Sequence, residues 1–471
     1  MRATGPQRAA LAGLFGFAAL QCAWNLWQVP ALTGYDDPAH AGYALTWALE
    51  QRWPHPMEGW STFHPPLWYW IASRIWRLLD AADAQLLMLA LRLPGALAIL
   101  ALAGLCFAAC RRVGTSFGSA WVATAVALFL PAAQMAGAML GNEALAAGFA
   151  AAALLPLLAL QREPERLGSA AAAGLFAGLA LATKYSGAFA ALACAVPFLR
   201  PGWNARRLRA AAAAGLVASA VAGPIYARNW LLTGTPFPIL REHEPTASQE
   251  ARNVLRPRRV ADYLWIDPAA LRRPSIYHVA GDASSELRRN PAMTNVFGLA
   301  LASSWYDAFA HRIPTPYHRD GVWSGQLLVA LGLVPTGLAL FGLARAARAA
   351  FASRLRSETA PLAAIWGLGL AGFVGFTAWA PSLVAVKGSY LLPLLPAGCV
   401  FLAQTCDWLR PDLRRLAHGV STAAALAAAL VFWEGLLFEP QPVEKMARTW
   451  RVLGAALPGS HIAESVDRLV P

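Results

Sequence analysis

Charged side chains are scarce in this chain. Asp, Glu, Lys and Arg make up only 14% of its 471 residues, against about 25% in an ordinary soluble domain. Hydrophobic residues make up 57%, which is more apolar surface than a water-soluble protein of this size can bury. The composition therefore excludes a disordered chain and a cytosolic enzyme, and it indicates an all-α polytopic membrane protein.

Cysteine and lysine are rare as well. None of the six cysteines lies in a CxxC pair, which excludes a disulfide framework. Of the 39 basic residues, 36 are Arg and only three are Lys. The sequence has no glycine-rich phosphate loop and no nucleotide-binding fingerprint. If this membrane protein is an enzyme, we therefore expect it to take an activated substrate from the membrane and not to use a soluble nucleotide.

Long apolar stretches dominate what is present. A membrane-spanning helix needs about 20 mostly apolar residues. The stretches 169–183 and 185–200 are shorter, and only Lys184 separates them, which predicts a tight helical hairpin. We expect about eleven spans, near 9–30, 87–110, 117–139, 143–160, 169–183, 185–200, 210–231, 323–343, 361–382, 388–406 and 417–437.

The segment 65–79 is apolar but short, and it carries two arginines, so we expect an interfacial helix lying on the membrane. With that choice, the short loops on one side of the membrane hold 17 Arg against 5 acidic residues. Basic residues concentrated in short loops mark the cytoplasmic side. The net charge of +13 is thus a topology signal, and nucleic-acid binding has no support.

These spans divide the chain into four parts. We expect an N-terminal transmembrane module over 1–231, whose first outside loop, 31–86, holds interfacial helices. A large outside loop follows over 232–322, then C-terminal transmembrane helices over 323–437 and an outside tail over 438–471. The Arg- and Ala-rich composition favours the cytoplasmic membrane of a high-GC bacterium, with the outside face toward the periplasm.

An Asp-Asp pair begins the first outside loop. Asp37, followed by Pro38, is a good helix start with Asp at the N-cap. Asp36 has no such structural task, and a carboxylate at the membrane surface can act as a general base. His40 and His64 lie in the same loop, and a divalent cation bound there is an alternative that matches no specific metal motif. No cofactor is required by the sequence.

Other ionisable residues lie at the same edge of the membrane. Glu143 heads a predicted span, where it would either cap the helix or take part in function. Lys184 and Lys387 are two of the three lysines of the chain. A compact ammonium suits a phosphate bound as a point charge, so we expect both to bind phosphate. Arg228 adds a further cation at this level.

Taken in order, several motifs resemble the GT-C superfamily of glycosyltransferases, and most closely the family 39 and 83 branch. That branch contains the protein O-mannosyltransferases and the lipid A aminoarabinose transferase. The matching motifs are YDDPAHAGYAL, HPPLWYWIASRIWRLL, ALRLPG, GNEALAAG, GLALATKYSG, ARNWLLTGTPFP and VKGSYLLPLLP. Each is weak alone, but together they cover most of the chain.

The resemblance implies an inverting transfer of a sugar from a polyprenyl-phosphate carrier to a hydroxyl-type acceptor on the outer face. It implies that Asp36 is the catalytic base and that Glu143 matches a second acidic motif. Asp37, His40 and His64 would contact substrate, and Lys184, Lys387 and Arg228 would neutralise the carrier phosphate. The partners are then this lipid-linked donor, an unknown acceptor and the bilayer. The alternative is a transporter or flippase for a lipid-linked or anionic substrate.

Overall fold

The structure is a computed structural model of the whole chain. It describes residues 4–28, 36–59, 61–79, 84–202, 204–238, 258–264, 266, 295–306, 320–380 and 386–438. Most of the predicted outside loop 232–322 and all but the first residue of the predicted tail lie outside the described residues. The proposed division of the chain into four parts therefore stays a prediction.

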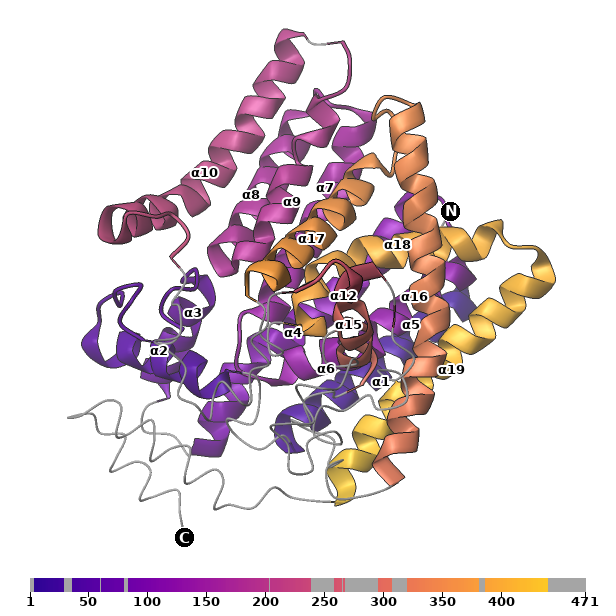
Figure 1. Ribbon diagram of the computed structural model, residues 1–471, viewed down its shortest axis with the longest axis horizontal. Helices are drawn as coiled ribbons and strands as arrows, with labels where there is room; N and C mark the ends of the chain where they lie inside the picture. The colour runs from indigo at the N-terminus through magenta and orange to yellow at the C-terminus, as the bar shows by residue number, and fades with distance from the viewer. Residues whose placement is uncertain are drawn as a thin grey trace.

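The described part is built of helices, and no strand occurs in it (Figure 1). The α-helices are α1 (Gly5–Gln28), α2 (Asp37–Glu50), α3 (Leu67–Leu78), α4 (Ala84–Arg112), α5 (Phe117–Phe129), α6 (Pro131–Ala138), α7 (Glu143–Arg162), α8 (Leu167–Thr183), α9 (Ala188–Ala193), α10 (Ala205–Thr233), α12 (Ala261–Leu264), α15 (Val296–Trp305), α16 (Asp320–Ala352), α17 (Ala360–Trp379), α18 (Leu395–Trp408) and α19 (Pro411–Phe438). Short 3₁₀ segments are η1 (Tyr185–Gly187), η2 (Val196–Phe198) and η6 (Gly388–Leu394).

The predicted fold class is confirmed. In the described residues, each of the eleven predicted apolar stretches contains helix. Within the described residues, seven helices are long and apolar enough to cross a membrane, or eight if the bent pair α5 and α6 forms one span. The predicted hairpin around Lys184 has one continuous arm, α8. Its second arm is broken into η1, α9 and η2.

The helices pack in a row that can be followed in Figure 1. Helix α10 lies on α8, α8 on α7, α7 on α4 and α4 on α5, while α18 and α19 pack on α5 and α16 closes the far side. Small residues allow the close contacts of this row. A Cβ at Gly174 of α8, for example, would lie only 2.2 Å from the carbonyl oxygen of Ala214 in α10.

The bend between α5 and α6 has a clear cause. The two helices meet at 50° beside Pro131, which has no backbone N–H to continue the hydrogen-bond ladder. The buried Gln134 side chain donates to the carbonyl oxygen of Leu128 and accepts from Asn25 of α1 at 2.8 Å. These bonds satisfy polar groups at the break, and the bend directs α6 toward the start of α7.

Helices α2 and α3 form a separate small unit of the first loop, and they pack on one another. Helix α3 has 12 residues, so it is about 18 Å long, which is too short to span a bilayer. It buries Trp68, Tyr69 and Trp76 on one face and exposes Trp70. The Arg74 guanidinium lies over the Trp70 ring, 5.6 Å from the ring centre. This two-faced pattern is typical of an interfacial helix.

Candidate active site

The Asp-Asp pair lies at the start of α2, one position further into the helix than expected: Asp36 is the N-cap, and Asp37 is the first helical residue. The N-cap residue is Asp36, whose carbonyl accepts the first helical bond from the His40 N–H at 2.9 Å. The prediction that Asp37 is the N-cap is therefore wrong by one residue. Asp36 has a left-handed backbone, with φ of 43°, which Asp tolerates better than most residues. Its side chain makes no cap hydrogen bond, so the carboxylate is available for other contacts.

The Asp36 carboxylate instead binds Lys387. The Lys387 Nζ atom donates to Asp36 Oδ2 at 3.0 Å, across 351 positions of sequence. Lys387 is buried, and the residue after it approaches α15 very closely: a Cβ at Gly388 would lie 2.6 Å from the Ser304 nitrogen. The Gly388 N–H donates to Ser303 Oγ at 2.8 Å. This close approach, which only glycine permits, fixes the backbone that presents Lys387.

A second ion pair joins the next two candidates. The Lys184 Nζ atom lies 2.5 Å from Glu143 Oε1, and both side chains are mostly buried. Glu143 is the first residue of α7, as predicted, while Lys184 follows the last residue of α8. Here too a glycine fixes the turn, because a Cβ at Gly187 would lie 2.3 Å from the backbone of Ala180.

One aromatic ring connects the two ion pairs. The Nζ atoms of Lys184 and Lys387 lie 5.0 and 5.7 Å from the centre of the Tyr390 ring, within the range of cation–π attraction. Two of the three lysines of the chain and two carboxylates thus form one compact group at helix ends. We call Asp36, Glu143, Lys184, Lys387 and Tyr390 the lysine–carboxylate cluster.

Two histidines, the buried His40 and the half-buried His64, lie beside this cluster. The rings of His40 and His64 are 5.7 Å apart, and His40 Nδ1 lies 2.7 Å from the Tyr69 hydroxyl. The Asn142 Nδ2 group donates to the same hydroxyl at 3.4 Å, and Asn142 Oδ1 accepts from Lys184 at 3.3 Å. A continuous hydrogen-bonded path therefore links the first loop to the cluster.

The charges set the protonation of these groups. Burial acts to raise the pKa of Asp36, but Lys387, His40 and His64 outweigh it and hold that pKa below its usual range. Burial lowers the pKa of His40 and, more strongly, that of His64. At neutral pH the site therefore holds an ionised Asp36 and two neutral imidazoles. Within the described ranges, no group of three or more His, Cys, Asp or Glu residues is arranged to hold a metal ion.

Two of the predicted site residues make contacts of another kind. The buried Asp37 interacts electrostatically with Arg92, a buried residue of α4. The Arg228 side chain donates to the carbonyls of Trp53 and Pro54 at 3.0 and 2.9 Å and lies over the Trp53 ring at 4.1 Å. Both residues thus attach the first loop to the transmembrane helices.

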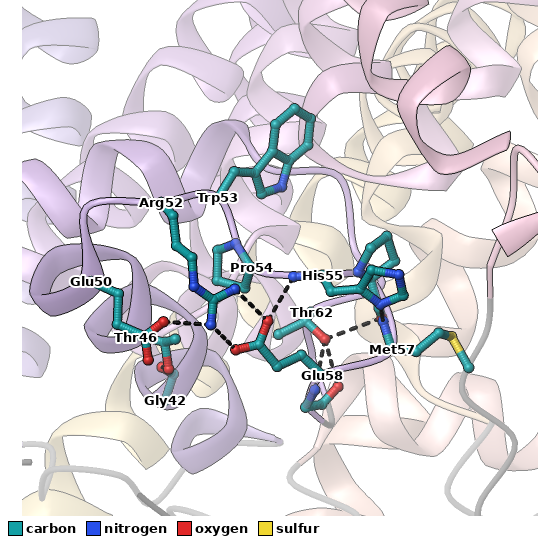
Figure 2. Close-up of polar contacts among 12 residues, drawn as sticks. Gly42, Thr46, Glu50, Arg52, Trp53, Pro54, His55, Met57, Glu58 and Thr62 are labelled. Carbon is teal, nitrogen blue, oxygen red and sulfur yellow. Dashed lines mark hydrogen bonds and ion pairs between the residues drawn. The ribbon is translucent and has the colours of Figure 1, made fainter. Parts of the chain in front are cut away.

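The turn that leads to His64 is held by its own ion pairs, shown in Figure 2. Arg52 Nη1 donates to Glu58 Oε2 at 2.8 Å, and the His55 N–H donates to the same oxygen at 2.7 Å. Beyond the turn, the carbonyl of Phe63 accepts from the Tyr185 hydroxyl at 2.6 Å. The loop is therefore tied directly to η1, which adjoins Lys184.

The structure brings together six of the eight predicted residues: Asp36, His40, His64, Glu143, Lys184 and Lys387. Three further members were not predicted as site residues, namely Tyr69, Asn142 and Tyr390. Each is adjacent to, or within, a motif that was noticed: Asn142 precedes Glu143, and Tyr390 lies three residues after Lys387. Tyr69 belongs to the aromatic run of α3, and aromatic residues of this kind are typical of anchoring at a membrane interface.

No protein-family model matches the chain, and no curated protein sequence matches it. Solved structures do resemble it. The crystal structure of ArnT from Cupriavidus metallidurans bound to undecaprenyl phosphate has a TM-score of 0.54 at 17% identity, and the match covers 97% of this chain and 82% of that one. The apo form of the same protein gives 0.54 at 16% identity, over 96% and 81% of the two chains.

An oligosaccharyltransferase from Archaeoglobus fulgidus, tethered with an acceptor peptide, is also similar. Its TM-score is 0.50 at 11% identity, over 98% of this chain and 59% of that one. At these identities the likeness concerns the fold, and it extends over nearly the whole chain. The chain therefore has the fold of the GT-C glycosyltransferases.

Proposed function

We propose that this protein is an inverting glycosyltransferase that moves a sugar from a polyprenyl-phosphate carrier to a hydroxyl-type acceptor at the outer face of the membrane. The observation that carries the proposal is the lysine–carboxylate cluster, in a chain with the GT-C fold. It combines a candidate base, Asp36, with two fixed cations, Lys184 and Lys387, at the ends of membrane helices.

The two lysines suit the leaving group. As the sugar departs, negative charge develops on the carrier phosphate, and preorganised cations at that point lower the barrier. The ammonium groups of Lys184 and Lys387 lie 5.0 and 5.7 Å from the centre of the Tyr390 ring, so both cations are in the part of the site where we place the phosphate. In the free protein their charges are balanced by Asp36 and Glu143. The incoming phosphate would then compete with the carboxylates for the lysines.

Asp36 suits the acceptor side of the reaction. Its side chain is 41% exposed, whereas its partner Lys387 is 7% exposed, so an acceptor hydroxyl could reach the carboxylate. The Asp36 carboxylate would accept the hydroxyl proton while the acceptor oxygen attacks the anomeric carbon opposite to the phosphate. Attack from that side inverts the configuration of the sugar.

The other residues have supporting roles in this proposal. Glu143 forms an ion pair with Lys184, and the buried His40 and the half-buried His64 lie beside this pair, with their rings 5.7 Å apart. Asp37 interacts with Arg92, and Arg228 donates to the Trp53 and Pro54 carbonyls, so we assign both residues a role in holding the first loop in place. This division of roles requires no metal ion.

The test uses the purified full-length protein in detergent with a panel of radiolabelled polyprenyl-phosphate sugars and candidate hydroxyl acceptors. Release of the lipid phosphate together with transfer of the label supports the proposal, and the anomeric configuration of the product tests inversion.

The transporter alternative is tested in proteoliposomes of the same preparation. Movement of the labelled lipid across the bilayer, without cleavage of the sugar–phosphate bond, would contradict the proposed transfer and support the alternative. Cleavage without transmembrane movement is the result that the proposal predicts.

A further inference from the structure

We propose that Lys184, Asn142, Tyr69 and His40 form a one-directional hydrogen-bond relay that makes His40 a donor to an oxygen of the bound phosphate. This inference rests on the proposed function, because it takes the carrier phosphate as the ligand of the site. It assigns a ligand-contacting role to the His40 Nε2–H group and positioning roles to Tyr69 and Asn142.

The direction of the relay follows from its first member. A lysine ammonium only donates hydrogen bonds, so the Asn142 atom that lies 3.3 Å from Lys184 must be the acceptor oxygen. The other end of this amide is then its NH₂ group, which donates to the Tyr69 hydroxyl at 3.4 Å. The Tyr69 hydroxyl has one proton of its own, and that proton is free to point at His40 Nδ1, 2.7 Å away.

The relay determines which nitrogen of His40 carries the proton. Since Nδ1 accepts from Tyr69, the neutral imidazole must have its proton on Nε2. Burial of His40 lowers its pKa and so favours this neutral form. Burial also raises the pKa of Tyr69, which keeps the hydroxyl protonated as the relay requires. His40 therefore presents a fixed N–H donor.

The surroundings of His40 show where that donor is directed. Among the described residues, no side chain forms a hydrogen bond with Nε2. The ring edge that carries it adjoins the cluster: a Cβ built on Gly141 would lie 3.7 Å from His40 Cδ2 and 2.7 Å from Glu143 Oε2. An anion bound by Lys184 would lie beside this edge. An oxygen of that anion is the acceptor that fits a fixed N–H donor next to an ammonium group.

The relay also couples the lysine to the histidine. When a phosphate draws Lys184 toward itself, the amide of Asn142 keeps its orientation only while the ammonium stays on its oxygen. Loss of that bond would release Asn142, then Tyr69, and finally the tautomer of His40. The relay therefore fixes the His40 tautomer only while Lys184 contacts the phosphate and the Asn142 oxygen at the same time.

The experiment measures the dissociation constant of undecaprenyl phosphate for the full-length protein in detergent. Two substitutions at His40 differ in what they preserve: His40→Gln keeps an N–H donor near the position of Nε2, whereas His40→Asn keeps a polar group near Nδ1. We expect His40→Gln to bind within about threefold of the wild type and His40→Asn to bind about 10-fold more weakly, the loss typical of one charge-assisted hydrogen bond.

Tyr69→Phe tests the relay itself, and Tyr43→Phe is its matched control. The Tyr43 ring stacks on that of Tyr69, with ring centres 3.9 Å apart. Its hydroxyl accepts a hydrogen bond from Trp53 Nε1 and is not part of the relay. We expect Tyr69→Phe to weaken binding about fivefold and Tyr43→Phe to leave it unchanged. If Tyr69 had only a structural role, Tyr69→Phe and Tyr43→Phe would bind undecaprenyl phosphate equally well, and any difference from the wild type would be in thermal stability.

The outcomes separate the relay from the proposed function. Equal affinities for His40→Gln and His40→Asn, or for Tyr69→Phe and Tyr43→Phe, overturn the relay even if the wild type transfers sugar. Binding that follows the predicted order, in a wild type that transfers no sugar, supports the relay and counts against the proposed transfer. A wild type that does not bind undecaprenyl phosphate contradicts both.

Discussion

The Gly141→Ala substitution tests whether the position of the Glu143 carboxylate matters for turnover. A Cβ at Gly141 would lie 2.7 Å from Glu143 Oε2, whereas ordinary contacts begin at 3.4 Å. The carboxylate must therefore move by the difference, 0.7 Å. Because Glu143 Oε1 lies 2.5 Å from Lys184, such a shift disturbs the cation that we assign to the phosphate. A misplacement of about 1 Å at a reacting group can cost about 100-fold in rate.

We expect kcat of Gly141→Ala to fall roughly 10- to 100-fold. The thermal unfolding midpoint should change little, because the displaced atoms are the end of a flexible side chain. The assay is lipid phosphate release from a labelled polyprenyl-phosphate sugar, with Gly215→Ala as control, since no heavy atom lies within 4 Å of a Cβ built there. Wild-type turnover in Gly141→Ala would refute the assigned role of the Glu143–Lys184 pair.

Two further substitutions test the electrostatics and the packing. Lys387→Met removes the cation that does most to lower the pKa of Asp36. The carboxylate should then protonate at a higher pH, and the acid limb of kcat/KM should move to higher pH. Lys387→Arg keeps the charge, so an identical pH profile for the two variants would contradict this. Gly174→Ala should lower the free energy of unfolding by about 1–3 kcal/mol, because its Cβ would meet a backbone oxygen of α10 at 2.2 Å. Thermal unfolding in detergent measures this, with Gly168→Ala of the same helix, which meets no atom within 4 Å, as the control that should not be destabilised.

Much of the fold could be predicted because membrane helices are encoded locally. Each apolar stretch of sufficient length is helical in the structure, since a backbone in lipid must satisfy its own hydrogen bonds. The position of α3 could also be predicted, because its apolar residues and two arginines alternate with a helical period. The break of the second hairpin arm into η1, α9 and η2 was not predicted. At η1, Gly187 packs against the backbone of Ala180, and this contact is not visible in the local sequence.

The site was predictable where a residue was unusual for its surroundings. Lys184 and Lys387 stood out because the chain otherwise uses Arg, and Glu143 because it begins an apolar helix. The sequence predicted Asp37 at the N-cap and was wrong by one residue, because either aspartate can occupy that position. Lys387, 351 positions away, binds the Asp36 carboxylate, and this contact is not encoded locally.

Residues with an ordinary local interpretation were missed. Tyr69 belongs to an aromatic run typical of membrane interfaces, and Asn142 to a short turn. The contacts that led us to include them in the site are with His40 and Lys184, which lie far away in the sequence. Arg228 was predicted from its charge and its level in the membrane, and its phosphate role stays a prediction. The structure adds that its side chain donates to two backbone carbonyls of the first loop.

The central claim is that Asp36 acts as the base in sugar transfer from a lipid phosphate. The most direct measurement is the rate of labelled sugar transfer by the wild type, by Asp36→Asn and by Asp412→Asn, which changes an exposed aspartate of α19. Removing a general base typically costs about 10²- to 10⁴-fold. The account predicts a loss of that size for Asp36→Asn alone, with carrier binding retained. Equal transfer rates in all three proteins would contradict it.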